Sequence, residues 1–388
     1  MAGFSSYDDF INEATVNGKK FRQDWNKNFN PTTAAVAGEW HFMTRGAGNP
    51  GADALFNTGT NLTFQPVSDT TANAASILHG GNVSPDYKYI ANASAFSAAA
   101  TTMPSVAMLV DLVGFYRVTS LTTTTSQAMT NTLSAFSTFT ADAGTDICTH
   151  SNINLMPYTR VQLTTTTTLP AGLSLATDYY VIKVTDTTCK FATSYANAVA
   201  GTAIDITDAG TGTHTINTLL PRYTNGDGVQ AVIWNTNSTA LGAATPTLQL
   251  DNYTNSAQSS GRATPSSPSL PVGKTAASNT LVVYSGTGAG KYGPFMPLQA
   301  GDRGIAQVNN FDLSVSYVSG EVSIGLVRPL ITMPMTTIGV ASEREFMTQV
   351  AGGMPRVYDG AALYWLLYSG ANTPANSAFY GHADFVWG

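Results

Sequence analysis

The chain has 388 residues, of which 43% are hydrophobic and only 11% are charged, and its formal net charge is −6. A soluble domain usually carries about 25% charged residues, so uncharged polar side chains must cover most of this surface. An acidic chain has no long-range attraction to a nucleic-acid backbone, and no apolar run reaches the roughly 18 residues of a transmembrane helix, so we expect no direct nucleic-acid partner and no membrane partner.

Residues 1–60 differ from the rest of the chain and predict an N-terminal arm with one short helix. The helix is expected because a capping sequence at residues 5–9 precedes Phe10, Ile11 and Ala14 at helical spacing. Basic and aromatic residues then alternate over one stretch, which is typical of a docking arm for a nucleic acid or a protein partner. We favour the other interpretation of this stretch, a solvated helix or an extended arm whose aromatic residues pack on the body of the protein. The stretch contains Lys19, Lys20, Phe21, Arg22, Trp25, Lys27 and Phe29.

Residues 61–135 and 217–388 predict a single host domain that is mainly β. Short apolar runs alternate there with Gly, Pro, Asn and Thr, as in an antiparallel β-sandwich or jelly roll. Residues 341–350 are the exception, because Ser342 and Glu345 form a capping box that predicts a helix. The expected strands include residues 106–116, 229–234, 281–284, 311–318, 322–327 and 363–368.

Residues 136–216 predict a small β-domain inserted into the host domain. The sequence Asn-Thr-Leu at 131–133 recurs at 217–219, and five or six short strand-like runs lie between the two copies. An insertion at a surface turn leaves the host core intact. The alternative is one continuous sheet domain in which the repeat of Asn-Thr-Leu is a coincidence.

No residue pattern indicates catalysis, a metal or a cofactor, and we expect none of the three. The five histidines stand apart from one another and from the cysteines in the sequence. The glycine-rich run at 285–293 leads into Pro294 rather than into a helix, so it predicts a turn and not a phosphate site. Cys148 and Cys189 predict two free, partly buried thiols, with a bridge inside the inserted domain as the alternative.

Five stretches of the inserted domain, 160–163, 169–173, 178–182, 202–206 and 210–214, are similar to a small β-module found in many structural proteins of tailed bacteriophages. Three host segments, 220–226, 290–298 and 355–360, are similar to a group of phage virion proteins. The resemblance implies a structural role and gives no catalytic residues.

We therefore expect a non-enzymatic protein that decorates or cements the outer capsid as a homo-oligomer, with a trimer as the first expectation. Its partners would be itself and the major capsid protein or other virion proteins, and it would be assembled in the bacterial cytosol and reside on the capsid surface. The alternatives are a tail, fibre or baseplate component, the major capsid protein, or a glycan-binding surface protein. The expected contact residues are Phe21, Trp25, Phe29, Phe385 and Trp387.

The glycan alternative depends on aromatic side chains that could stack on sugar rings. The expected platforms are Trp234, Trp365, Tyr179 and Tyr180. Residues 136–216 are the expected region for a contact with a glycan or with the host surface.

Overall fold

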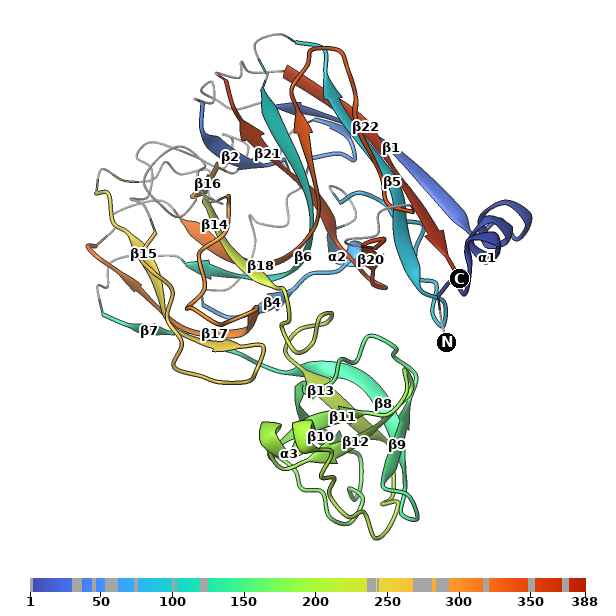
Figure 1. Ribbon diagram of the computed structural model, residues 1–388. Coiled ribbons are helices and arrows are strands. Elements are labelled where there is room, and N and C mark those ends of the chain that lie inside the picture. The colour runs from blue at the N-terminus through green and yellow to red at the C-terminus, as the bar shows by residue number, and fades with distance from the viewer. Residues whose placement is uncertain are drawn as a thin grey trace.

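Strands hold 47% of the residues and helices 6% in the computed structural model, which confirms the expected mainly β fold (Figure 1). The strands form three antiparallel sheets, which together make up the body, and one closed barrel. The structure describes residues 3–29, 37–43, 47–52, 62–72, 76–99, 102, 104–118, 125–235, 242, 244–267, 281–283, 293–316, 321–347, 353–371 and 377–388.

The first sheet, called here the outer sheet, has the order β19-β5-β22-β1-β3, with β20 also paired to β5. The N-terminal helix α1 (Tyr7–Ile11) precedes it, as expected, and the Ser6 hydroxyl accepts a hydrogen bond from the Asp9 amide at 3.0 Å. A π-helical turn at Asn12–Val16 follows. The strands of the outer sheet are β1 (Lys20–Phe29), β3 (Gly48–Asn49), β5 (Lys88–Ser97), β19 (Ser342–Glu345), β20 (Arg356–Val357) and β22 (Ser377–Trp387).

The central sheet has the order β18-β14-β16-β2-β21-β6-β4, and β18 also pairs with β6, so that six of its strands close a ring. Long strands β6 and β18 have almost no exposed residue over much of their length, because other layers cover them. The strands are β2 (Glu39–Phe42), β4 (Gln65–Pro66), β6 (Ser105–Val118), β14 (Gln230–Asn235), β16 (Leu281–Val283), β18 (Val322–Met335) and β21 (Leu363–Ser369). Helix α2 (Asp69–Ala72) follows β4.

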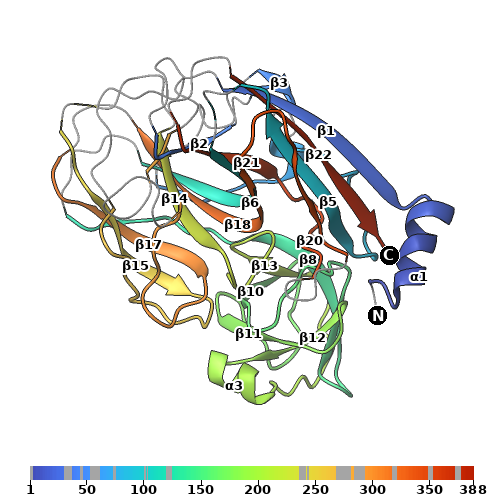
Figure 2. The same cartoon turned by 45° about the horizontal axis from the view of Figure 1, so that its top comes forward.

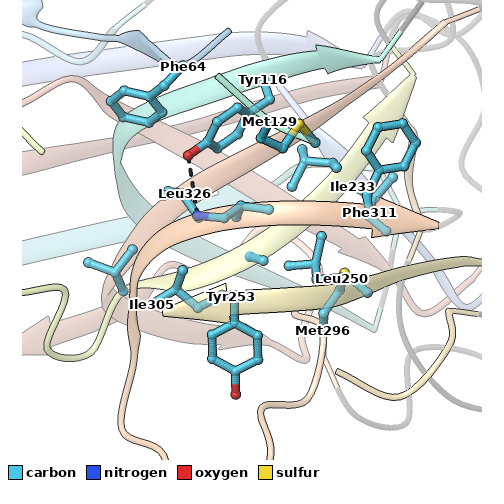
Figure 3. Close-up of a cluster of buried hydrophobic side chains, with 14 of the residues drawn as sticks. Phe64, Tyr116, Met129, Ile233, Leu250, Tyr253, Met296, Ile305, Phe311 and Leu326 are labelled. Carbon is cyan, nitrogen blue, oxygen red and sulfur yellow. Dashed lines mark hydrogen bonds between the residues drawn. The ribbon is translucent and has the colours of Figure 1, made fainter. Parts of the chain in front are cut away.

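The third sheet, β15-β17-β7, packs on the other side of the central sheet (Figure 1). It consists of β7 (Gln127–Ala128), β15 (Leu248–Asn255) and β17 (Ile305–Leu313). Figure 3 shows the core between these two sheets, where the Val308 amide donates to the Tyr116 hydroxyl at 3.3 Å. A second core cluster joins the outer and central sheets, and a third gathers side chains from the ring strands themselves. The body is therefore a layered, sandwich-like β structure.

The closed barrel lies below the body in both views and is formed by one continuous stretch of chain (Figures 1 and 2). Its first and last strands are directly paired, with Ser134 opposite Thr218. The barrel has its own apolar core, and its strand order is β10-β11-β12-β9-β8-β13. Its elements are β8 (Ser134–Asp142), β9 (Ile147–His150), β10 (Arg160–Thr165), β11 (Asp178–Lys183), β12 (Thr188–Ala192), α3 (Tyr195–Ala200) and β13 (His214–Thr218).

The two cysteines lie opposite each other in the barrel, on β9 and β12, and both are buried and free. Burial raises the pKa of the Cys148 thiol to about 12. Both thiols are therefore protonated at neutral pH.

The separate arm expected over residues 1–60 is wrong, because its middle part is integrated into the body. Strand β1 pairs along its whole length with β22, and Trp25 of β1 is 3% exposed. The basic residues of this segment also have local partners: Lys19 pairs with Glu13 and Asp86, and the buried Lys27 ammonium donates to the Gly51 carbonyl at 2.6 Å. Segment 20–29 is thus a strand of the outer sheet and not a docking arm.

The helix expected at residues 341–350 is also wrong. Ser342–Glu345 forms the edge strand β19, which pairs with β5, while residues 348–350 lie outside the described residues. An isolated helix of this length is marginal in water, whereas the edge of β5 offers backbone partners. Phe346 then enters the core with 4% exposure, a tertiary contact that the local pattern did not reveal. The expected turn at 285–293 lies almost entirely outside the described residues.

Candidate functional site

The five aromatic residues expected to make contacts all lie on the paired strands β1 and β22. Phe385 is fully buried, and Trp25 packs on Trp365 with ring centroids 4.9 Å apart. Phe21 lies opposite Phe385 and is only partly exposed, because it packs against the same core cluster. A contact role for Trp25 and Phe385 is therefore wrong: their side chains hold the outer sheet onto the central sheet.

Trp387 and Phe29 occupy the ends of the same strand pair. Trp387 is half-buried, and the Lys88 ammonium lies 5.6 Å from its ring centroid. Phe29 is the last residue of β1 and lies opposite Ser377, and its side chain is outside the described residues. Trp387 is not among the residues that line the cleft described next.

The opposite face of these strands points away from the core and carries a cleft of about 400 Å³, called here the outer-sheet cleft. Side chains alternate between the two faces of a strand, so the neighbours of the buried aromatic residues form this surface. In one cross-strand row, Asn26 lies opposite Tyr380 and Tyr380 opposite Phe96; in the next, Asp24, His382 and Ser94 are aligned. The cleft is lined by Asp24, Trp25, Asn26, Asn49, Ser94, Phe96, Tyr380, Gly381 and His382.

His382 is held in place by polar neighbours from two strands. Its Nδ1 lies 2.7 Å from the Ser94 hydroxyl, while its Nε2 lies 3.4 Å from the Asn92 amide nitrogen and 3.6 Å from an Asp384 carboxylate oxygen. Burial raises the pKa of Asp384, and the nearby Arg22 guanidinium, 3.6 Å away, opposes that shift. This cluster combines a hydroxyl, an imidazole and a carboxylate, but Ser94 is only 4% exposed, which leaves its hydroxyl little access to a substrate.

The aromatic part of the outer-sheet cleft is the pair Phe96 and Tyr380. Their rings are stacked with centroids 5.3 Å apart and an interplanar angle of 25°, and Tyr380 is 37% exposed. Stacked aromatic rings beside hydroxyl, amide and carboxylate groups can bind a ligand that has an apolar face and several hydroxyl groups. Sequence reasoning missed this arrangement because Phe96 and Tyr380 are far apart in the chain.

The stacking platforms expected from the sequence are largely unavailable. Trp234, Trp365 and Tyr179 have exposures of 0%, 3% and 3%, so their assignment as platforms is wrong. Tyr180 is half-buried on β11 and contacts Tyr195 edge to face. The covering of the central sheet by other layers explains why its tryptophans are core residues.

Two host segments, 220–226 and 355–360, meet at the junction between the body and the barrel. Tyr223 and Tyr358 contact edge to face with centroids 4.6 Å apart. The adjacent Arg222 is 1% exposed and makes a two-point ion pair with the fully buried Asp111, through N···O distances of 2.6 and 2.9 Å. These segments therefore include structural contacts of the body.

Comparisons with protein-family models, with curated proteins and with solved structures give no match to the chain. Within the described ranges, no group of three or more His, Cys, Asp or Glu side chains is arranged to hold a metal ion. None of the helices in the described part of the chain is long and apolar enough to cross a membrane.

Proposed function

We propose that this chain is a non-enzymatic structural protein of a tailed-bacteriophage particle, one that decorates or cements the outer capsid as a homo-oligomer. A trimer remains the first expectation for its oligomeric state, and the major capsid protein is the expected neighbour. The protein would be assembled in the bacterial cytosol and reside on the capsid surface. The proposal rests on the resemblance of residues 160–214 to a virion β-module and on the architecture described above.

The observation that carries the proposal is the closed barrel between Ser134 and Thr218. It has a separate core and is attached to a layered β body through directly paired residues. Such a barrel can project from a particle-bound body without altering the body's own packing. Few charged residues, 11% of the chain, also favour contacts made by apolar and hydrogen-bonding groups over nonspecific ionic association.

Purified particles test this proposal through copy number. A gel-based count well below that of the shell protein supports decoration, whereas a count near equality contradicts it and favours the major capsid protein. Imaging of particles labelled on the barrel distinguishes a capsid protein from a tail, fibre or baseplate component. A label on the tail, fibre or baseplate contradicts the proposed position on the capsid.

A second candidate function, glycan binding, is favoured by the outer-sheet cleft. The Phe96–Tyr380 pair offers a stacking surface, and Asp24, Asn26 and His382 supply polar groups beside it. Lectin-type sites combine such rings with a few placed polar groups. Neutral oligosaccharides are the expected class, because the charged groups beside the cleft already pair with one another: Arg22 lies 3.1 Å from Asp24 and 3.6 Å from Asp384.

A panel of neutral oligosaccharides tests the glycan candidate by direct binding to the purified protein. Tyr380→Ala should abolish binding, while Tyr7→Ala, which removes another exposed tyrosine (58% exposed) on α1, should not. Binding that survives Tyr380→Ala, or no binding across the panel, contradicts this second function.

A further inference from the structure

Two arginines and three tyrosines form a continuous series of side-chain contacts at the junction of the body and the barrel, called here the Arg–Tyr ladder. The Arg328 guanidinium lies 5.6 Å from the Tyr223 ring centroid, and Tyr223 contacts Tyr358. The Arg356 guanidinium lies between two rings, 4.3 Å from the centroid of Tyr358 and 3.6 Å from that of Tyr87. Arg356 thus has a tyrosine ring within contact distance on each of two sides, and Arg328 has one, which leaves part of each guanidinium group for hydrogen bonding in its plane.

Both arginines of the ladder line one cleft of about 250 Å³. The aromatic wall of this cleft is formed by Tyr223 and Tyr358. Its apolar wall is formed by Met156, Pro329, Leu330 and Pro355. The two guanidinium groups thus line a small cleft that also has an apolar wall.

The ladder has more positive charge than the surrounding carboxylates neutralise. Arg328 donates to the backbone carbonyl of Asp227 at 2.7 Å, whereas the Asp227 carboxylate lies 3.3 Å from Arg303. The Nε of Arg356 is buried and has no hydrogen-bond partner among the described residues. Within those residues, neither ladder arginine forms an ion pair with a carboxylate.

A further acid that interacts with Arg356, Asp186 of the barrel, already pairs with a lysine. Its carboxylate lies 3.0 Å from Lys183, and it attracts Arg356 only at longer range. Burial and a hydrogen bond to Asp186 raise the pKa of Tyr87 to about 12, so this ring stays neutral beside Arg356 at physiological pH. Two guanidinium groups therefore share one cleft without a dedicated anion.

Backbone groups on one turn position the Arg328 guanidinium. Its Nη1 donates to the Asp227 carbonyl at 2.7 Å, and the next residue, Gly228, has φ +69° and carries no Cβ atom, which would lie 1.1 Å from that nitrogen. A side chain at position 228 would therefore displace the guanidinium from this place. A side chain that is fixed before a ligand arrives loses less conformational entropy on binding.

We propose that the cleft beside the Arg–Tyr ladder binds a carboxylate group between Arg328 and Arg356. A planar carboxylate matches the in-plane N–H groups of a guanidinium and can accept two hydrogen bonds from it. The aliphatic stem of the ligand lies against Met156, Leu330 and the two prolines. Phosphate fits less well, because it has no apolar stem and its strongly hydrated oxygens would face the apolar wall.

The shared chemistry has two sources, a free carboxylate and an acidic side chain presented by a polypeptide. Titration calorimetry of the full-length protein at fixed ionic strength tests both, with glutarate, an end-blocked tetraglutamate peptide and inorganic phosphate as probes. We expect saturable binding of glutarate and of the peptide. Binding of the peptide alone assigns the site to a polypeptide carboxylate.

Substitutions of the two ladder arginines test whether they bind the carboxylate. Arg328→Gln and Arg356→Gln should each weaken carboxylate binding by at least about tenfold, because a two-point charged hydrogen bond is lost. Lys20→Gln changes the net charge equally at an exposed position on β1 and should leave the affinity within about twofold. Arg356→Lys keeps the positive charge but lacks the planar guanidinium group, and it should also weaken binding. It replaces Arg356→Gln in the test if that variant does not fold.

Three results would overturn the proposal. They are the absence of saturable binding to glutarate and the peptide, tighter binding of phosphate than of either carboxylate, and unchanged affinity in folded Arg328 and Arg356 variants. The test does not depend on a role in a phage particle, so its failure leaves the proposed function standing.

Discussion

Replacing Asp111 by asparagine tests how much the buried ion pair with Arg222 contributes to the body. One oxygen of Asp111 accepts from Nη2 of Arg222 at 2.6 Å and from the Ala362 amide at 3.0 Å, and the other accepts from Nε of Arg222 at 2.9 Å. Arg222 also donates to the carbonyls of Val67 and Leu112. The pair therefore connects several segments around β6.

The expected loss in the free energy of unfolding for Asp111→Asn is about 3 kcal/mol, because removing one partner of a buried pair leaves the other charge uncompensated and costs about 3–5 kcal/mol. Asparagine keeps the shape of the aspartate side chain and one acceptor oxygen, so we expect a loss at the lower end of this range of about 3–5 kcal/mol. Adding Arg222→Met removes the stranded charge and should recover at least about 1 kcal/mol.

Guanidinium chloride unfolding, followed by circular dichroism and tryptophan fluorescence, measures these differences. Asp24→Asn is the matched control, since its partner Arg22 is 54% exposed and Asp24 80% exposed, and it should change stability by less than about 0.5 kcal/mol. A loss below about 1 kcal/mol for Asp111→Asn would refute the reasoning. A double variant as unstable as the sum of both single changes would refute it as well.

Four further outcomes are expected. Burial lowers the pKa of Lys88 to about 8, so the unfolded chain binds more protons above that pH and stability should rise between pH 8 and 9.5 by up to about 1.4 kcal/mol per pH unit. Urea unfolding of Lys88→Met should lack this rise, and an identical pH slope would contradict the assignment. A thiol reagent at pH 8 should label neither Cys148 nor Cys189 until the protein unfolds, because burial raises the pKa of both thiols; rapid labelling of the native protein would argue against their burial. Deleting residues 1–29 should give insoluble or unfolded protein, since β1 would be lost from the outer sheet, and a soluble, folded product would show that β1 is dispensable. Replacing residues 135–217 by a two-residue glycine turn should leave a body with one cooperative melting transition, because the flanking residues already lie opposite each other. Loss of that transition would show that the body does not fold independently of the barrel.

Local patterns in the sequence predicted the elements that depend mainly on local alternation and apolar content. The strands expected at 106–116, 229–234, 322–327 and 363–368 correspond to β6, β14, β18 and β21. The strand expected at 311–318 is largely wrong, because β17 begins at residue 305 and ends at Leu313, and residues 314–316 are not in a strand. The inserted β-domain expected over 136–216 and the barrel strands at Ser134–Thr218 occupy nearly the same range. These elements could be found because turn residues interrupt short apolar runs at each boundary.

Residue pairs that are distant in the chain could not be predicted in this way. His382 appears isolated in the sequence, yet it contacts Ser94 across two paired strands, 288 residues apart in sequence. Likewise, the basic and aromatic residues of segment 20–29 indicate an N-terminal arm in the sequence, because nothing local shows that β22 lies beside them. The helix expected at 341–350 failed for the same reason, since the edge of β5 is provided by a remote part of the chain.

The direct pairing of Ser134 with Thr218 has a consequence for the order of folding. In the unfolded chain, about 80 residues separate the two flanks of the body, and closing a loop of that length costs about 2–3 kcal/mol more than closing a turn of a few residues. Once the barrel has folded on its own contacts, that loop is reduced to the distance between two paired strands. Early barrel formation should therefore accelerate the assembly of the three sheets. A mutation inside the barrel that slows barrel folding should also slow the folding of the body, although it changes no residue of the body.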